Sequence, residues 1–251
     1  MAERKLITQE DILKALDAVY ARSINGIPKV SKPIAELSED YLKRNPDVQT
    51  AAKKMLNAQI AKCTTSGFIT GFGGLITLPV SIPANVGSVM YVQMRMIAAC
   101  AYMGGFNVNE DQVQTFIYAC LAGVSINEIL KKLGVNFGKK MAEVGLKKLP
   151  GKILVKINQK VGFRFLTKFG EKGMVNLVKA VPVVGAVING GLDYAETKII
   201  ANRAFKMFIK KDFSDDSDKD ENIIDVDELD LSYLDEDLEK EQSENERASE
   251  E

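Results

Sequence analysis

Histidine and tryptophan are absent from this chain of 251 residues. Without histidine there is no imidazole general base, no Ser–His or Cys–His nucleophile pair and no imidazole ligand for zinc. The three cysteines, Cys63, Cys100 and Cys120, lie in apolar surroundings and are too far apart for a CxxC site. We expect them in the core of a protein from a reducing compartment. The first 16 residues carry too many charges for the apolar segment of a signal peptide. These absences favour a cytoplasmic protein, and the sequence identifies no catalytic residue, metal or cofactor.

Charge is missing from one long stretch. Residues Cys63–Met94 contain no Asp, Glu, Lys or Arg, although 27% of the whole chain is charged. Glycines and prolines interrupt the stretch, so we expect two apolar helical arms joined by a turn. This Gly/Pro hairpin either packs tightly in the core or dips into lipid, and each arm is near or below the length that spans a bilayer. Its defining residues are Gly67, Gly71, Gly73, Gly74, Pro79 and Pro83.

Helical periodicity runs through the remainder of the chain, and no segment shows sustained alternation of apolar and polar residues. Thr8 and Asp11 predict a capping box for a first helix that ends near Ser23, followed by a connector at residues 25–33. The second arm should run from Ala84 to Tyr102. Further N-caps are expected at Asn45, Asn109 and Ser125. The predicted fold is all-α: a compact multi-helix domain with a Gly/Pro-rich apolar hairpin.

The charges are divided unevenly along the chain. Residues 212–251 contain 19 Asp+Glu and 3 Lys+Arg, a net charge of −16, which leaves +15 on residues 1–211. Such dense acid prevents a packed core, so the tail is expected to be disordered. We divide the chain into an N-terminal helix and connector (1–44), a helical domain (45–211) and an acidic disordered tail (212–251). A basic body of this kind faces a phospholipid surface, a nucleic acid or its own tail.

The basic residues concentrate between Lys131 and Lys179, with 13 Lys+Arg against two Glu. Apolar residues such as Ile153, Ile157, Val161 and Phe165 alternate with them at helical spacing. Two interpretations remain open: an interfacial helix whose apolar face enters lipid, or a solvated lysine face over a core face. The candidate anion-binding residues are Lys131, Lys132, Lys139, Lys140, Lys147, Lys148, Lys152, Lys156, Lys160, Arg164, Lys168 and Lys172.

Nucleic acid is the less favoured partner for these lysines. Residues 131–179 contain no tyrosine or tryptophan, and Arg164 is the sole arginine between residues 100 and 202. Base recognition usually draws on arginine and on stacking aromatic side chains. An anionic membrane surface therefore comes first.

Two uncharged Gly/Pro blocks, taken together, resemble the EcsC family of bacterial proteins. The first runs from Gly67 through Pro83 to Arg95–Ala98, Tyr102 and Gly104. The second is Val181-Pro182-Val183-Val184-Gly185-Ala186, followed by Asn189 and the helix to Phe208. The resemblance covers about residues 45–210. It implies a helical protein at the cytoplasmic membrane surface, from a family named for a gene beside an ABC transporter of the Ecs type. It carries over no catalytic residue.

Carboxylates offer the remaining chemistry. Asp193 and Glu196 share a helix face, where they form either an acid pair or a solvated ion-pair face with Lys198 and Arg203. The apolar side of that helix is expected to hold Ile199, Ile200, Ala204, Phe205 and Phe208. Four tail aspartates match the spacing of a calcium loop but have Glu221 where glycine is required.

Three hypotheses follow from the sequence. The first is a non-enzymatic, peripheral membrane protein on the inner membrane face that binds anionic lipid through its basic region and is gated by its acidic tail. The second is a soluble scaffold or regulator of a membrane transporter or another protein. The third is a hydrolase that uses carboxylates such as Glu196. The sequence leaves the oligomeric state open.

Overall fold

A computed structural model describes residues 8–28, 30–64, 84–132, 149–169 and 196–213. Within these segments the chain is helical and has no strand, which confirms the all-α prediction, and an isolated bridge joins Ile27 to Ser31. The C-terminal helix comprises residues 196–204 and continues as the π-helix η1, Phe205–Ile209. The other helices are α1 (Gln9–Asn25), α2 (Ile34–Arg44), α3 (Val48–Thr64), α5 (Ala84–Met103), α6 (Asp111–Ala122), α7 (Ile126–Lys132) and α9 (Gly151–Phe169).

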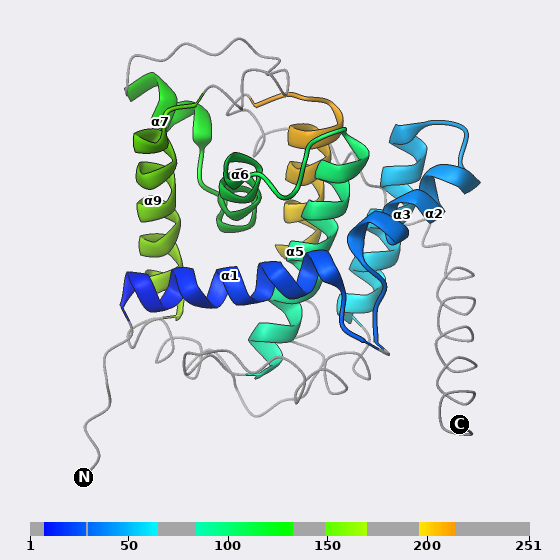
Figure 1. Cartoon of the computed structure of the whole chain (residues 1–251), viewed down its shortest axis with the longest axis horizontal. Helices are drawn as coiled ribbons and strands as arrows, with labels where there is room; N and C mark the ends of the chain where they lie inside the picture. Colours follow the sequence, from blue (N-terminus) through cyan, green and yellow to red (C-terminus); the bar gives the residue numbers. More distant parts are fainter. Residues whose placement is uncertain (1–7, 29, 65–83, 133–148, 170–195, 214–251) are drawn as a thin grey trace.

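Helix α5 lies at the centre of the molecule (Figure 1). It packs against α1, α2, α3, α6 and η1, and every residue from Met90 to Ala101 is buried. This explains the lack of charge in the second predicted arm, because a helix surrounded on all sides has no solvated face for charged side chains. The arm is predicted to end at Tyr102 and ends at Met103, directly before the predicted stop at Gly104.

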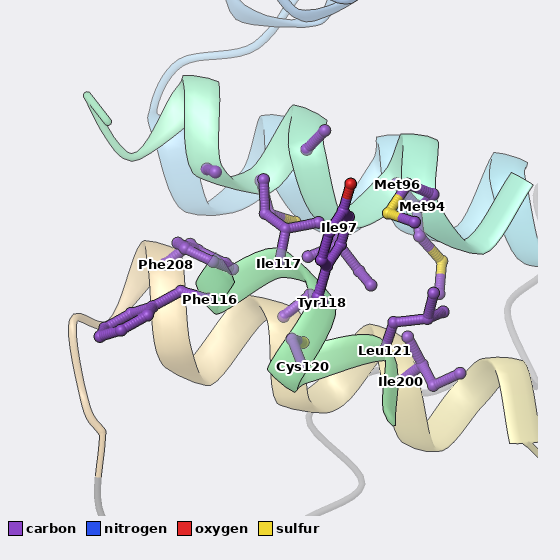
Figure 2. Packing of buried hydrophobic residues seen from close by; sticks show 14 of the residues in the cluster. Met94, Met96, Ile97, Phe116, Ile117, Tyr118, Cys120, Leu121, Ile200 and Phe208 are labelled. Atoms are coloured by element: carbon purple, nitrogen blue, oxygen red, sulfur yellow. The ribbon is translucent and has the colours of Figure 1, made fainter. Parts of the chain in front are cut away.

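Helix α6 is a second buried helix, and it completes the core between α5 and the C-terminal helix. Residues Thr115–Leu121 are all buried. Figure 2 shows Phe116 near Phe208, and Leu121 near Ile200, where these helices meet. All three cysteines are buried as expected from their surroundings. Burial raises the pKa of the Cys120 thiol to about 12, so this side chain behaves as an apolar core residue.

Two glycines permit close backbone contacts that a side chain would prevent. A Cβ atom at Gly104 would overlap the carbonyl oxygen of Phe208, so glycine lets the end of α5 lie directly against η1. Gly26 has a positive φ of 74°, and a Cβ there would overlap the carbonyl oxygen of Ser31. Glycine is therefore also required in the turn between α1 and α2.

Helix starts agree with the sequence at two of the four predicted caps. The Thr8 side chain and the Asp11 backbone and side chain form the predicted capping box of α1. The Ser125 hydroxyl oxygen accepts a hydrogen bond from the Glu128 backbone N–H at 3.0 Å, as expected at the start of α7.

The predictions for Asn45 and Asn109 are wrong. Helix α2, which the sequence patterns above do not predict, ends at Asn45, whose amide donates back to the Tyr41 carbonyl. The cap of α3 is instead Asp47, whose carboxylate accepts hydrogen bonds from the Thr50 backbone N–H and hydroxyl. Helix α6 begins after Glu110, without a side-chain cap.

Within the described residues, no single helix is long and apolar enough to cross a membrane, although α6 and α7, bent by 114° at their junction, pass that test as a pair. Most of the Gly/Pro hairpin (Gly67, Gly71, Gly73, Gly74, Pro79, Pro83) lies outside the described residues, as do Pro182 and Gly185 and the tail from residue 214 onward.

Candidate functional site

Helix α9 carries the described part of the predicted basic segment. Its apolar residues Ile153, Ile157, Val161 and Phe165 are buried, and the helix packs against α6 and α1. This face is therefore part of the core. The interpretation in which it enters lipid is wrong, and the alternative of a core face applies.

The outward side of α9 combines positive charge with apolar surface. Lys152 and Lys156 are exposed, and the large apolar side chains Val155 and Phe163 on the same side are 54% and 57% exposed. Val155 and Lys156 follow Lys152 by three and four residues, and Phe163 follows Lys156 by seven. These spacings place all four side chains on one face of the helix. We call this set, Lys152, Val155, Lys156 and Phe163, the outward lysine face. Lysine and exposed apolar side chains on one helix face are the combination found where helices lie on membrane surfaces.

Other predicted basic residues lie close to this face. Lys160 forms an ion pair with Glu128 of α7, with Nζ and Oε2 3.4 Å apart. This contact ties α9 to α7, where Lys131 and Lys132 are exposed at the last turn. The side chains of Lys139, Lys140, Lys147, Lys148, Lys168 and Lys172 lie outside the described residues.

Arg164 differs from the lysines because its side chain turns toward the end of α6. Its Nη1 donates to the Gly123 carbonyl oxygen at 3.0 Å. From the C-terminal helix, Arg203 Nη1 donates to the Cys120 carbonyl oxygen at 2.9 Å. Gly123 ends α6 in the left-handed conformation, with φ of 65°, and its N–H bonds to the Ala119 and Cys120 carbonyls. Two cations at the negative end of the α6 dipole stabilise that end electrostatically.

A pocket of about 220 Å³ opens beside these two arginines. Four helices form its walls: α5, α6, α9 and the C-terminal helix. Gln93, one of its lining residues, donates to the Thr197 hydroxyl oxygen at 3.0 Å, and both side chains are buried. We call it the arginine pocket; its lining residues are Met90, Gln93, Leu121, Ala122, Gly123, Arg164, Phe165, Glu196, Ile199, Ile200 and Arg203.

The sequence predicts Arg203 and Glu196 on the polar face of a helix, and in the structure both line the arginine pocket. Ile199, expected on the apolar side of that helix, is instead 53% exposed and lines the pocket; Ile200, Ala204, Phe205 and Phe208 are buried as expected. Asp193, the other member of the suggested acid pair, is outside the described residues. Among the residues that are described, no three His, Cys, Asp or Glu side chains lie close enough together to hold a metal ion.

Comparison with known proteins gives one match. The model of the EcsC protein family matches residues 9–213. The match begins at α1, well before residue 45, and ends at Phe213, whose side chain is buried and packs edge-on against Phe116 with ring centroids 5.8 Å apart. No curated protein and no solved structure shows significant similarity to the chain.

Proposed function

This chain belongs to the EcsC protein family, and from that premise we propose that it is a non-enzymatic protein that attaches peripherally to the cytoplasmic face of an anionic membrane. The outward lysine face would make the contact, together with Lys131 and Lys132 at the end of α7. The observation that carries the proposal is the exposure of Val155 and Phe163 on the same helix face as Lys152 and Lys156.

Lysine and apolar side chains contribute to membrane attachment in different ways. Each lysine near an anionic leaflet contributes about 1 kcal/mol, and salt screens this attraction. Transfer of an exposed Phe side chain out of water contributes about 1.5–3 kcal/mol if its burial is complete, and salt screens it little. A surface that has both should bind anionic vesicles in a salt-sensitive manner and retain weak binding at high salt.

Co-sedimentation with vesicles tests the proposal. The full chain should sediment with phosphatidylcholine vesicles that contain phosphatidylglycerol, and much less with phosphatidylcholine alone. The variant K152E/K156E should lose most of this binding, about tenfold or more, because it replaces two attractive charges with two repulsive ones. The variant V155S/F163S should lose the salt-resistant part.

A charge-matched control is available on the opposite side of the molecule. Lys43 on α2 and Lys54 on α3 are also exposed, and these helices lie far from α9 (Figure 1). The variant K43E/K54E changes the net charge by the same amount and should keep its vesicle binding. Equal losses in the two double variants would mean that net charge alone matters, and would reject the outward lysine face as the contact.

If the chain binds no vesicle, peripheral attachment is rejected. The second hypothesis would then replace it: a soluble scaffold or regulator that docks on a membrane transporter or another protein. The exposed Val155 and Phe163 would be the first residues to test in that docking surface.

A further inference from the structure

We propose that the arginine pocket binds a carboxylate carried on a short apolar chain, with Arg164 and Arg203 holding the anionic group. This inference does not depend on the outward lysine face. It rests on three features of the pocket: the convergence of two guanidinium groups, the net charge of the lining, and the apolar wall beside them.

The two guanidinium groups lie close to each other beside Gly123, at the edge of the pocket. A Cβ atom placed on Gly123 would lie 3.2 Å and 3.3 Å from the Arg203 Nη atoms, and 3.4 Å from Arg164 Nη2. These arginines come from two different helices, yet both border the same small space at the end of α6. Like charges this close repel each other, and an anion bound between them would offset part of that repulsion.

Arg164 also has donors left for a ligand. A guanidinium has five N–H donors, and within the described part of the chain the Arg164 side chain has one hydrogen-bond acceptor, the Gly123 carbonyl oxygen. A carboxylate accepts two parallel N–H bonds from such a group, and this bidentate geometry is the favoured one.

The charges of the lining indicate a ligand with a single negative charge. Arg164, Arg203 and Glu196 are the ionisable side chains that line the pocket, so its net charge is +1. A carboxylate neutralises this charge, whereas a doubly charged phosphate monoester would reverse it. A phosphodiester has the right charge but carries two substituents, and the volume of about 220 Å³ leaves little room for them.

The wall beside the arginines would receive the apolar chain. Met90, Leu121, Phe165, Ile199 and Ile200 contribute most of it, and Figure 2 shows Leu121 and Ile200 side by side. A mainly apolar lining with a few polar groups is typical of small-molecule sites, although this volume lies below the usual range of roughly 300–1,000 Å³. A short chain is therefore expected.

Calorimetric titration of the full-length protein with octanoate tests the inference, with octanol as the uncharged control. Octanoate should bind, and octanol should bind at least about tenfold more weakly because it forms no charge-assisted hydrogen bonds. Arg164→Gln should weaken octanoate binding about tenfold. Lys152→Gln, which removes one positive charge from the same helix, is the matched control and should have no effect.

A second pair of variants leaves the arginines in place. Ile199 is 53% exposed at the pocket, so Ile199→Glu should fold normally and place a competing carboxylate beside the arginines, which should weaken octanoate binding about tenfold. Ile199→Gln has the same size without the charge, so the difference in octanoate affinity between the Glu and Gln variants measures the effect of the competing carboxylate. This pair decides the question if circular dichroism shows that Arg164→Gln does not fold.

Two results would overturn the proposal. One is equal affinity for octanoate and octanol, which would make the pocket apolar only. The other is unchanged octanoate binding in folded Arg164→Gln and Ile199→Glu proteins, which would leave the arginines as a structural clasp on α6. Unchanged octanoate binding in K152E/K156E would show that the pocket acts independently of membrane attachment.

The carboxylate could come from a membrane or from solution, and two arms of the experiment separate these sources. In one arm the protein is mixed with phosphatidylcholine vesicles that contain decanoate, and transfer of decanoate to the protein is measured after the vesicles are removed. In the other arm soluble octanoate is supplied without vesicles. Transfer of decanoate supports a membrane source, and binding of octanoate without such transfer supports a soluble one.

Discussion

Arg95 is the one charged residue of α5, and it is buried with 5% of its surface exposed. Its Nη1 donates to the Ser23 carbonyl oxygen at 3.1 Å, and its Nη2 donates to the carbonyl oxygen of Lys32. Ser31 also bonds to the core, because its Oγ and the Tyr91 hydroxyl are 2.6 Å apart. The arginine therefore fastens the turn between α1 and α2 onto the central helix, where backbone carbonyls would otherwise be buried without donors.

Replacement of Arg95 by Met should lower the free energy of unfolding by about 2–4 kcal/mol, because the buried Ser23 carbonyl and the partly buried Lys32 carbonyl lose their donor. Urea denaturation monitored by circular dichroism measures this change. Arg44→Met, at the exposed end of α2, should change stability by less than about 0.5 kcal/mol. A loss of that small size at Arg95 would mean that water replaces the guanidinium.

At the scale of one element, the start of α3 shows how a cap is selected. Asn45 and Asp47 are both good N-cap residues, and they compete across Pro46. Asn45 instead bonds back to Tyr41 at the end of α2, whereas Asp47 accepts from the Thr50 backbone. These backbone and hydroxyl donors of Thr50 lower the pKa of Asp47 below its ordinary value.

Asp47→Ala should therefore reduce the melting temperature at pH 7 by about 2–4 °C. Because the folded-state pKa of Asp47 is lowered, its stabilising effect is present above the unfolded-state pKa and is lost as pH falls through the folded-state value. The difference between Asp47→Ala and the parent protein should shrink below about pH 4. Thermal melts at both pH values measure it. A larger effect for Asn45→Ala than for Asp47→Ala would contradict this assignment.

Sequence patterns predict the features of this fold that depend on nearby residues. Local signals predict the α1 cap at Thr8 and the end of α5 before Gly104, because both depend on residues within a few positions. The pattern of α2 is present in Ile34, Leu37 and Tyr41, all of them buried, and is simply short. Helical periodicity identifies the apolar side of α9 but does not say whether core or lipid covers it, because both require the same spacing.

The arginine pocket lies beyond local patterns altogether. The hydrogen bond from Arg164 to Gly123 spans 41 residues, and that from Arg203 to Cys120 spans 83. A glycine after the apolar run of α6 does predict the end of that helix. Nothing near it in the sequence indicates which distant cations reach that end, since tertiary packing alone brings them there.

For the whole molecule, the boundary between body and tail follows from Phe213. Its side chain is buried, and Asp212 pairs with Lys206, with Nζ and Oδ2 3.8 Å apart. A truncation that tests the acidic tail must therefore keep both residues. Residues 214–251 contain 18 Asp+Glu and 3 Lys+Arg, so the truncation still removes a net charge of −15.

If the tail gates membrane attachment, removal of residues 214–251 should increase binding to anionic vesicles several-fold at low salt, because the lysines no longer have an acidic competitor. The effect should disappear near 0.5 M salt, where screening is strong. Co-sedimentation across a salt series measures both. Identical binding curves for the truncated and full-length proteins at low salt would reject gating by the tail.

The central position of α5 also has a consequence for biosynthesis. Helix α6 follows it closely, but Phe205, the first residue of η1, comes 102 residues after Met103. Until η1 is synthesised, the flank of α5 that packs against it in the finished molecule lacks that cover. We therefore expect the nascent chain to expose apolar surface of α5 until the C-terminal helix leaves the ribosome.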